Sequence, residues 1–326
     1  MLAQRARGRN RDRGKFHEGG NIMKKSFLLF PIFSLFFFLF ILITSAHATI
    51  FGIKTCAGDP ICPGNPSFPP SQLFSFQEDG SSFQDIGVVK LNNQSVDVDG
   101  LALSSRYGLM GFVLTGSNSQ LVKINSNTAQ ATVVGSPLSS RKIRGAAFDS
   151  NGVLWAVDEQ SDELLRINPQ NGNIQGTPVK LQYSIGTGTD IAIKQGGSFF
   201  ISAGNNIYSL DINSGTMNLL FTDTHREPAP VGWSEHPFYP GLAFPSDSSS
   251  FNLFAYEVNG YDDIYYFDQN FSRHLLYSDI ISSFNAGRGD LASSTVPIPG
   301  TLWLFSSSLA GLIIKRTWYK KNGTPG

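Results

Sequence analysis

Cysteine is nearly absent from this chain, since Cys56 and Cys62, in the stretch TCAGDPIC, are the only two. Two cysteines alone supply too few ligands for a cysteine-bound metal site. The role that the pair is expected to have depends on the compartment in which the protein lies. Outside the cytoplasm, a Cys-x5-Cys pair most often closes a small structural disulfide, and two free thiols are the alternative. In the cytoplasm, the pair would be half of a metal site.

A basic stripe is also absent from the middle of the chain. The formal net charge of zero averages three regions. Residues Met1–Ala48 carry eight Lys and Arg against two acidic residues, and the segment after Thr295 carries four basic residues and no acidic ones. The middle keeps 13 basic against 23 acidic residues, a net charge of −10. Because phosphate binding depends on clustered Lys and Arg, the acidic charge of this body argues against nucleic acid as a partner.

Long apolar runs occur only near the two ends, and the first follows the pattern of an export signal. The stretch MKKSFLLFPIFSLFFFLFILITSAHAT has two lysines, an apolar run over Phe27–Ile43, and small residues at Ala46 and Ala48. This order predicts a secretory signal peptide over 23–48, cut by signal peptidase after Ala48. An uncleaved membrane anchor is the alternative. The basic residues 1–22 are either a disordered extension or lie before a true start at Met23.

The middle contains an internal repeat. Five short echoes share an alanine: GLALS, GAAFD, DIAIK, GLAFP and GDLAS, with Ala102, Ala147, Ala192, Ala243 and Ala292. These alanines are 45, 45, 51 and 49 residues apart. Each echo is followed by a strand-like stretch and then by a strand, a turn and a strand, as in LLRINPQNGNIQGTPV. A period near 45 residues predicts a β-propeller with four-stranded blades.

The phase of the repeat indicates how the ring closes. The chain enters on the second half of a unit, LFSFQEDGSSFQDIGVV from Leu73, and leaves on the first half, GDLAS. A blade shared by both ends would close the ring and hide two sheet edges. We therefore predict an all-β fold, a propeller of five blades whose composite blade has no evident second strand. A sixth irregular blade and an open β-sandwich are the alternatives.

The repeat units resemble those of secreted bacterial β-propellers, in which L-Y-x-I-[DN]-x-x-[TS]-G leads into a short apolar strand. The resemblance covers about Leu73 to Leu291 and implies the fold, not an activity.

Charged residues begin several of the innermost strands, which is where a propeller's central channel opens. Asp99, Arg144, Asp190 and Asp290 precede or enter the alanine-containing echoes. Carboxylates that converge on the axis could hold Ca²⁺ through oxygen ligands. The alternative is that these side chains accept hydrogen bonds from backbone N–H groups at the strand starts. We favour this structural role over Ca²⁺ binding and expect no cofactor.

Catalytic motifs are missing. There is no Gly-x-Ser-x-Gly turn, no zinc-type histidine spacing and no phosphate-binding glycine loop. The insertion THREPAPVGWSEHPFYP, over 224–240, is the main candidate ligand loop, with Trp233, Glu235, His236 and Tyr239. Together with His225, its His–Glu pair could ligate a metal or act as acid and base, as in propeller lyases or lactonases. Its prolines and aromatic residues equally fit a rigid surface loop.

Aromatic residues offer a third kind of site, because exposed rings stack on the faces of sugars. The candidates are Trp233, Phe238, Tyr239, Tyr256, Tyr261, Tyr265 and Tyr266. Packing in the core or on hairpins is the alternative, since strands favour Tyr and Phe.

The second apolar run, VPIPGTLWLFSSSLAGLIIKR, lies at the C-terminus, with basic residues after it. Its length is near the lower limit for a spanning helix. It resembles the PEP-CTERM sorting signal of Gram-negative bacteria. Val296, Pro297, Pro299 and Gly300 match the leading motif, the LAGL stretch matches the helix, and the basic tail begins at Lys315 and Arg316. The chain departs from the pattern at Ile298, where Glu is commonest, and in a basic cluster that is spread out.

The resemblance to a sorting signal implies that an exosortase cleaves the chain near the proline motif, after a transient intermediate in the inner membrane. It also implies an association with exopolysaccharide or biofilm. A plain anchor is the alternative. We expect a linker over 49–71, a propeller over 72–294 and a sorting segment over 295–326. The predicted function is a non-catalytic binding module at the cell surface or in the extracellular matrix, and a secreted propeller enzyme is the alternative.

Overall fold

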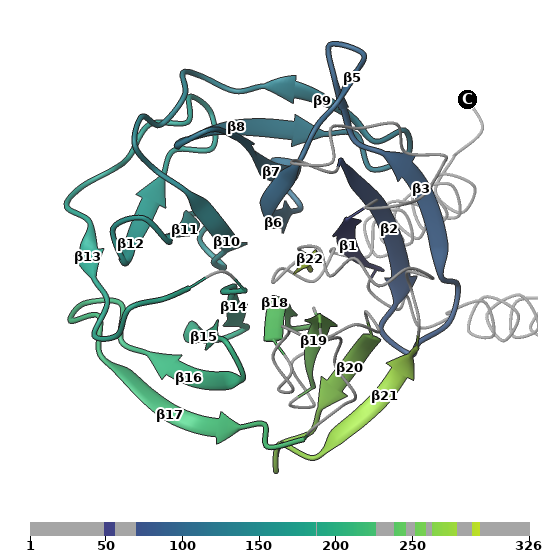
Figure 1. The fold of residues 1–326 in the computed structure, drawn as a ribbon, viewed down its shortest axis with the longest axis vertical. Coiled ribbons are helices and arrows are strands. Elements are labelled where there is room, and N and C mark those ends of the chain that lie inside the picture. Colours follow the sequence, from purple (N-terminus) through teal and green to yellow (C-terminus); the bar gives the residue numbers. More distant parts are fainter. Residues whose placement is uncertain are drawn as a thin grey trace, which may run out of the picture. The chain divides into compact units, whose positions relative to one another are not determined.

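The structure is a computed structural model. It describes residues 49–55, 70–186, 188–225, 238–245, 252–258, 263–278 and 289–293. Every regular element in these ranges is a strand. Five sheets stand around a central axis (Figure 1), so the predicted five-bladed β-propeller is confirmed. None of the described segments contains a helix long and apolar enough to cross a membrane.

Blades 3, 4 and 5 follow the chain order from the axis outward. Blade 3 has β10 (Ile143–Phe148), β11 (Leu154–Asp158), β12 (Glu163–Ile167) and β13 (Val179–Lys180). Blade 4 has β14 (Ile191–Lys194), β15 (Ser198–Ala203), β16 (Asn206–Leu210) and β17 (Met217–Thr222). Blade 5 has β18 (Phe238–Ala243), β19 (Leu253–Val258), β20 (Asp263–Phe267) and β21 (Arg273–Tyr277).

Blades 1 and 2 depart from this order. Blade 2 has β6 (Val98–Ser104), β7 (Gly108–Thr115), β8 (Asn118–Ile124) and β9 (Gln130–Val133), and it is extended by β4 (Lys90–Leu91) and β5 (Gln94–Ser95). Blade 1 is the composite blade, with β22 (Gly289–Ala292) at the axis, then β1 (Thr49–Thr55), β2 (Ser71–Gln77) and β3 (Gln84–Val88). Both ends of the described chain therefore build one sheet.

The composite blade has four strands, which corrects the expectation that its second strand is missing. β1 supplies it and lies inside the range 49–71 that the sequence pattern assigned to a linker. It pairs with β2 along its whole length and with β22 from Phe51↔Ala292 to Lys54↔Gly289. The strand is inconspicuous because it follows the apolar signal directly and contains Gly52, over which the Phe74 ring lies. A Cβ at Gly52 would come within 2.2 Å of that ring.

The strand–turn–strand series is explained by one local interaction. At the end of the third strand in blades 2 to 5, an Asn or Asp side-chain oxygen accepts the backbone N–H two residues ahead. The pairs are Asn125 with Asn127 at 2.9 Å, Asn168 with Gln170 at 2.9 Å, Asp211 with Asn213 at 3.0 Å, and Asp268 with Asn270 at 2.8 Å. These Asx turns stabilise the outer hairpin of each blade.

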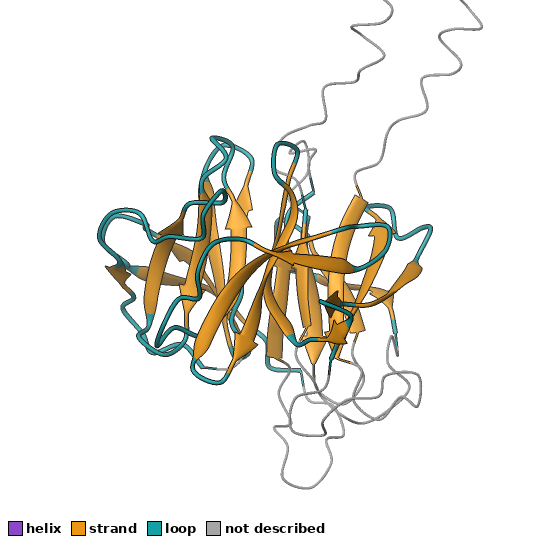
Figure 2. Cartoon of the chain, turned by 90° about the horizontal axis from the view of Figure 1, so that it is seen from above, coloured by secondary structure: helices purple, strands orange, loops and turns teal. Residues whose placement is uncertain are grey.

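Seen edge-on in Figure 2, the strands run between two faces of the ring. We call the face where the innermost strands begin the start face, and the opposite one the end face. Because β1 and β22 are antiparallel, Thr49 and Ser293 both lie at the end face.

The five innermost strands differ at the position two residues before the shared alanine. Blades 2, 3 and 5 have Gly100, Gly145 and Gly241 there, and blades 4 and 1 have Asp190 and Asp290. The glycines leave room for the aspartates. A Cβ at Gly145 would lie 2.4 Å from the Asp190 carboxyl, and one at Gly241 would lie 2.8 Å from the Asp290 backbone. Only two side chains therefore enter the axis at this level.

These two carboxyl groups bind a backbone amide from every blade. Asp190 accepts the N–H of Ile191 at 2.6 Å and of Leu242 at 2.5 Å, and also that of Ala146. Asp290 accepts the N–H of Leu291 at 2.7 Å, and also that of Leu101. The five donors occupy equivalent positions, each one residue before the shared alanine. Unpaired in a dry interior, each amide would cost about 1–3 kcal/mol.

The two carboxyl groups also share a hydrogen bond, which requires a proton on one of them. Both side chains are fully buried. Burial disfavours the charged form and raises the pKa of Asp190 to about 8 and that of Asp290 well above its ordinary value. Next to the pair, inner-strand residues such as Ala147 and Ala192 line a space of only about 10 Å³, no more than one water molecule needs.

Ring closure through β22 gives a first prediction. A chain that stops after Arg288 loses β22, whereas one that stops after Thr295 keeps it. We expect the first chain to lose at least the roughly 2–5 kcal/mol that removal of one buried Leu costs, because Leu291 and the Asp290 contacts disappear together. Urea unfolding of both chains measures the difference. Equal stability would contradict closure by the composite blade.

The axial pair gives a second prediction. The pKa of Asp190 is about 8 and that of Asp290 is raised as well, both above the ordinary value of 3.8. The folded chain therefore holds more protons than the unfolded chain does between pH 3.8 and about 8. The free energy of unfolding should therefore fall as the pH rises from 5 to 8, by about 1.4 kcal/mol per pH unit for each retained proton. Asp290→Asn removes one proton site and should reduce that slope by at least about half.

Unfolding midpoints at several pH values measure the slope. Asp290→Asn also lowers the overall stability, because the amide has only one oxygen for the amides of Leu101 and Leu291. The slope, and not the absolute stability, therefore decides the outcome. An unchanged slope in the variant would show that other groups cause the pH dependence.

Candidate functional site

Ionisable side chains end the second strand of three blades at the start face. In each of these blades, one residue of the second strand pairs with the shared alanine of the innermost strand. Three residues after that paired residue stand Lys54, Asp158 and Glu257, which therefore occupy equivalent positions. All three are buried, and each has an oppositely charged partner. Lys54 pairs with Asp85 at 2.8 Å, Asp158 with Arg141 at 2.8 Å, and Glu257 with Arg273.

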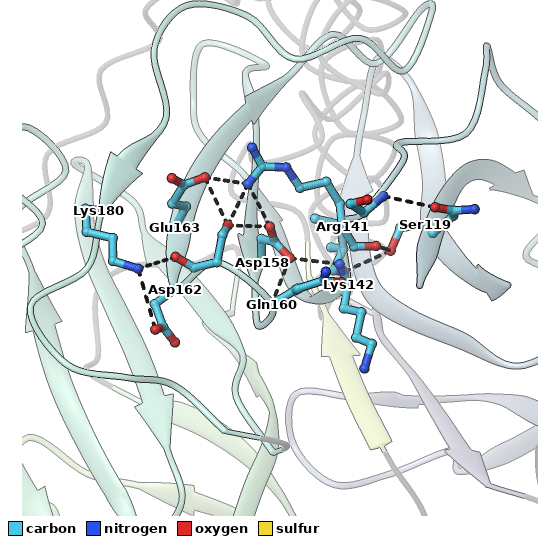
Figure 3. Close-up of polar contacts among 12 residues, drawn as sticks. Ser119, Arg141, Lys142, Asp158, Gln160, Asp162, Glu163 and Lys180 are labelled. Atoms are coloured by element: carbon cyan, nitrogen blue, oxygen red, sulfur yellow. Dashed lines mark hydrogen bonds and ion pairs between the residues drawn. The ribbon is translucent and has the colours of Figure 1, made fainter. Parts of the chain in front are cut away.

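The Asp158 cluster joins the loop that enters blade 3 to the loop between β11 and β12 (Figure 3). Asp158 accepts the Arg141 guanidinium at 2.8 Å and the Lys142 backbone N–H at 2.8 Å. Arg141 also reaches Ser161 at 2.6 Å and Glu163. Burial acts to lower the pKa of Arg141, but the two carboxylates outweigh it and the pKa is raised. Because these charged groups already pair with one another, the cluster holds the two loops together.

A second arginine lies nearer the channel. Arg144 contacts Asp99 at 2.6 Å and Glu159 at 2.5 Å. Burial acts to lower the pKa of Arg144, and these two carboxylates raise it overall. Of the residues considered for Ca²⁺, Asp190 and Asp290 therefore meet on the axis, while Asp99 binds an arginine. In the described part of the chain, no group of three or more His, Cys, Asp or Glu side chains is arranged to hold a metal ion.

The third cluster lines an open groove between blades 4 and 5. The Arg273 guanidinium lies 3.6 Å from the centre of the Tyr265 ring and 3.2 Å from the Asp223 carboxylate, and it also binds Glu257. Tyr239 donates its hydroxyl to Asp223 as well. Burial acts to lower the pKa of Arg273, but Glu257 and other neighbours raise it overall. The guanidinium is therefore charged and fixed in direction.

The groove has a volume of about 710 Å³. Its described lining combines rings and polar groups: Phe221, Thr222, Asp223, Thr224, His225, Tyr265, Phe271, Arg273 and Leu275. Phe221 from β17 and Phe271 from the β20–β21 turn stack at 5.7 Å with an interplanar angle of 8°. The backbone N–H of His225 donates to Asp223 at 2.7 Å. The groove offers apolar rings beside a fixed cation and a carboxylate.

Five of the seven aromatic residues proposed from the sequence lie in the described ranges, and three of these five, Tyr239, Tyr256 and Tyr265, are buried. Tyr239 and Tyr256 are fully buried, and Tyr265 lies under Arg273. Burial, Glu257 and Asp223 raise the pKa of Tyr239. Tyr266 stacks on the exposed His274 at 4.7 Å. Tyr239 is thus part of a strand and its core, and not of an exposed ligand loop.

Several other proposed residues lie outside the described ranges. They are Ala46, Ala48, Cys56, Cys62, Trp233, Glu235, His236, Tyr261, Val296, Pro297, Pro299, Gly300, Lys315 and Arg316. His225 is the one histidine of the insertion within the description, and it lies at the groove.

The sequence patterns did not reveal Asp223, Glu257 and Arg273 as a group. Asp223 follows β17, Glu257 lies in β19 and Arg273 begins β21, so the three residues are far apart in the sequence. They meet because blade 4 packs against blade 5. One sequence signal could have pointed to this group: Glu257 occupies the same position in its repeat unit as Asp158 does in another.

No known protein family matches the sequence, and no curated protein matches it. Among solved structures, a protein of unknown function from Bacteroides caccae is similar, at 11% identity, with a TM-score of 0.45 and coverage of 76% of this chain and 98% of that one. A structure of a nidogen–laminin complex is similar at 11% identity, with a TM-score of 0.47 and coverage of 76% and 100%. Virginiamycin B lyase from Staphylococcus aureus is similar at 12% identity, with a TM-score of 0.37 and coverage of 70% and 73%. At such values these similarities assign no activity or ligand to this chain.

Proposed function

We propose that this chain is an exported protein of the cell surface or extracellular matrix whose propeller is a non-catalytic binding module. Signal peptidase removes residues up to Ala48, and an exosortase-type enzyme cuts near Val296–Pro299 after a passing stay in the inner membrane. The ligand is an extracellular polysaccharide, bound in the groove beside Arg273. The observation that carries the binding role is the open groove with a fixed guanidinium next to aromatic rings.

The groove's chemistry supports a sugar ligand. A volume of about 710 Å³ lies within the roughly 300–1,000 Å³ of ordinary small-molecule sites. Phe221 and Phe271 offer apolar ring surface for the C–H face of a sugar ring. Asp223 and Arg273 offer an acceptor and donors for its hydroxyl groups. The body carries 13 basic against 23 acidic residues, and this charge favours neutral over anionic polysaccharides.

The position of the strand ends supports processing at both ends. Ala48 directly precedes the first residue of β1, and Val296 follows the last described residue, Ser293, by three positions. Both flanks attach at the end face, where β1 and β22 pair. Cleavage at the two predicted sites therefore removes none of the described strands.

A secreted propeller enzyme, of the metal-dependent lyase or lactonase type with the 225–240 loop, is the second candidate. One observation favours it: His225 and Asp223 both line the groove, and the backbone N–H of His225 donates to the Asp223 carboxylate. A histidine beside a carboxylate is suited to acid–base chemistry or to metal binding.

Intact-mass measurement of the protein from its producing cells tests the processing. We expect a chain that begins at Thr49 and ends near the proline motif, because both cuts fall outside the folded strands. The test requires no knowledge of the ligand. A mass that retains the C-terminal run would contradict exosortase processing, and a mass that retains Met23–Ala48 would favour the uncleaved anchor.

Polysaccharide binding is tested with the full chain in detergent, using a neutral glucan and a polyuronate as probes. We expect the glucan to bind more tightly, and Leu275→Ser to weaken it by about tenfold, because Leu275 lines the groove. Val133→Ser is the matched control, since Val133 is also an exposed apolar residue on an outer strand. It should leave binding unchanged.

Failure of both probes to bind, or equal loss in both variants, would contradict the groove as a glycan site. Metal analysis of the same preparation distinguishes the second candidate. A stoichiometric transition metal that is lost in His225→Ala would favour the enzyme over the binding module.

A further inference from the structure

The outermost strand of each blade presents a row of backbone groups to its surroundings, a geometry that invites pairing with another chain. In the described sheets, four of the five outer strands carry a feature that opposes such pairing. β3 carries Asp85, β13 has two residues and carries Lys180, β21 carries Arg273, and β9 is covered by β4 in parallel register. β17 has six residues, Met217–Thr222, and no charged side chain.

The side chains of β17 are unusually apolar for an outer strand. Leu219 is 57% exposed and Leu220 is 40% exposed. A β-bulge causes this pair: Tyr208 lies opposite Leu219 and Ile207 lies opposite Phe221, so Leu220 is the extra residue. A bulge can protect a strand edge from pairing with another chain. The outer strands β3 and β21 have bulges as well, so the bulge does not set β17 apart from them.

Apolar surface continues on both faces of the strand. On the Leu219 face, Tyr183 is 46% exposed and its ring lies 5.7 Å from that of Tyr208. On the other face, Phe221 lines the groove together with Leu275, which is 55% exposed. Four of the five most exposed large apolar residues in the described chain thus belong to β17 or lie around it. Such a concentration marks an interaction surface.

We propose that β17 is a homodimer contact, in which the β17 strands of two copies pair antiparallel across a two-fold axis and join their blade 4 sheets. A second copy fits because antiparallel apposition of two uncharged strands brings no like charges together and places leucine near leucine. The other outer strands of the described sheets each contain a charged residue, Asp85, Lys180 or Arg273, or are covered by a further strand. This contact is independent of the proposed processing, and its test variants, at Leu219 and Leu220, lie outside the residues that line the groove.

The charge of the body sets how the contact should respond to salt. Each copy's middle region carries a net charge of −10, and two such bodies repel each other at low ionic strength. Screening at about 0.3 M salt reduces the repulsion, while apolar strand pairing remains. The dimer should therefore become tighter as salt is added, unlike a contact held by ion pairs.

Sedimentation equilibrium of the full chain in density-matched detergent tests the proposal. At about 100 µM protein and about 0.3 M salt, we expect twice the chain mass of 35.6 kDa. Leu219→Lys and Leu220→Lys should each weaken association by at least about tenfold, because each places a cation against its symmetry mate. Val133→Lys is the matched control, because Val133 is 49% exposed on β9, and β4 pairs with the first two residues of that strand's outer edge.

Hydrogen exchange provides a second measurement that does not depend on a variant. The backbone amides of β17 should become more protected as the protein concentration rises, and those of β21 should not. A wild-type chain that stays monomeric under these conditions would overturn the proposal. An assembly that both β17 variants leave intact, or that Val133→Lys dissolves equally, would overturn it as well.

Discussion

The innermost strand of each blade turns its backbone amides toward an axis where no further strand can pair with them. In this ring, Asp190 and Asp290 take that role for all five blades, since together they accept the amides of Leu101, Ala146, Ile191, Leu242 and Leu291. Glycines at the equivalent positions of the other blades make the room that two side chains need. The buried carboxyl pair holds a proton that its burial favours, and the closed ring depends on this arrangement.

Because the axis is filled, the larger space between the described blades lies away from it. The space along the inner strands is about 10 Å³, whereas the groove between blades 4 and 5 is about 710 Å³. The Arg273 network that lines this groove also ties the two blades together through Asp223. A residue such as Arg273 therefore serves both the packing of the ring and the proposed site. The outer edge of the same blade carries the apolar strand β17, so blade 4 contributes to both proposed contacts.

Repetition made much of the fold predictable. The shared alanines mark strands that lie next to the axis in every blade, and the Asx turns account for the recurring Asn and Asp residues. The composite blade followed from the phase of the repeat, but β1 did not, because Gly52 under Phe74 breaks its pattern. The starts of the inner strands showed charged residues. Only their meeting in space revealed that Asp190 and Asp290 pair with each other while Asp99 pairs with Arg144.

Native-state hydrogen exchange of the five axial amides tests the account most directly. These amides lie on strand edges that have no strand beyond them, and edge amides ordinarily exchange through local opening. If the carboxyl pair holds all five blades, the amides of Leu101, Ala146, Ile191, Leu242 and Leu291 should exchange only through global unfolding, with one common free energy. Fast exchange of these amides, with free energies that differ from blade to blade, would contradict the account.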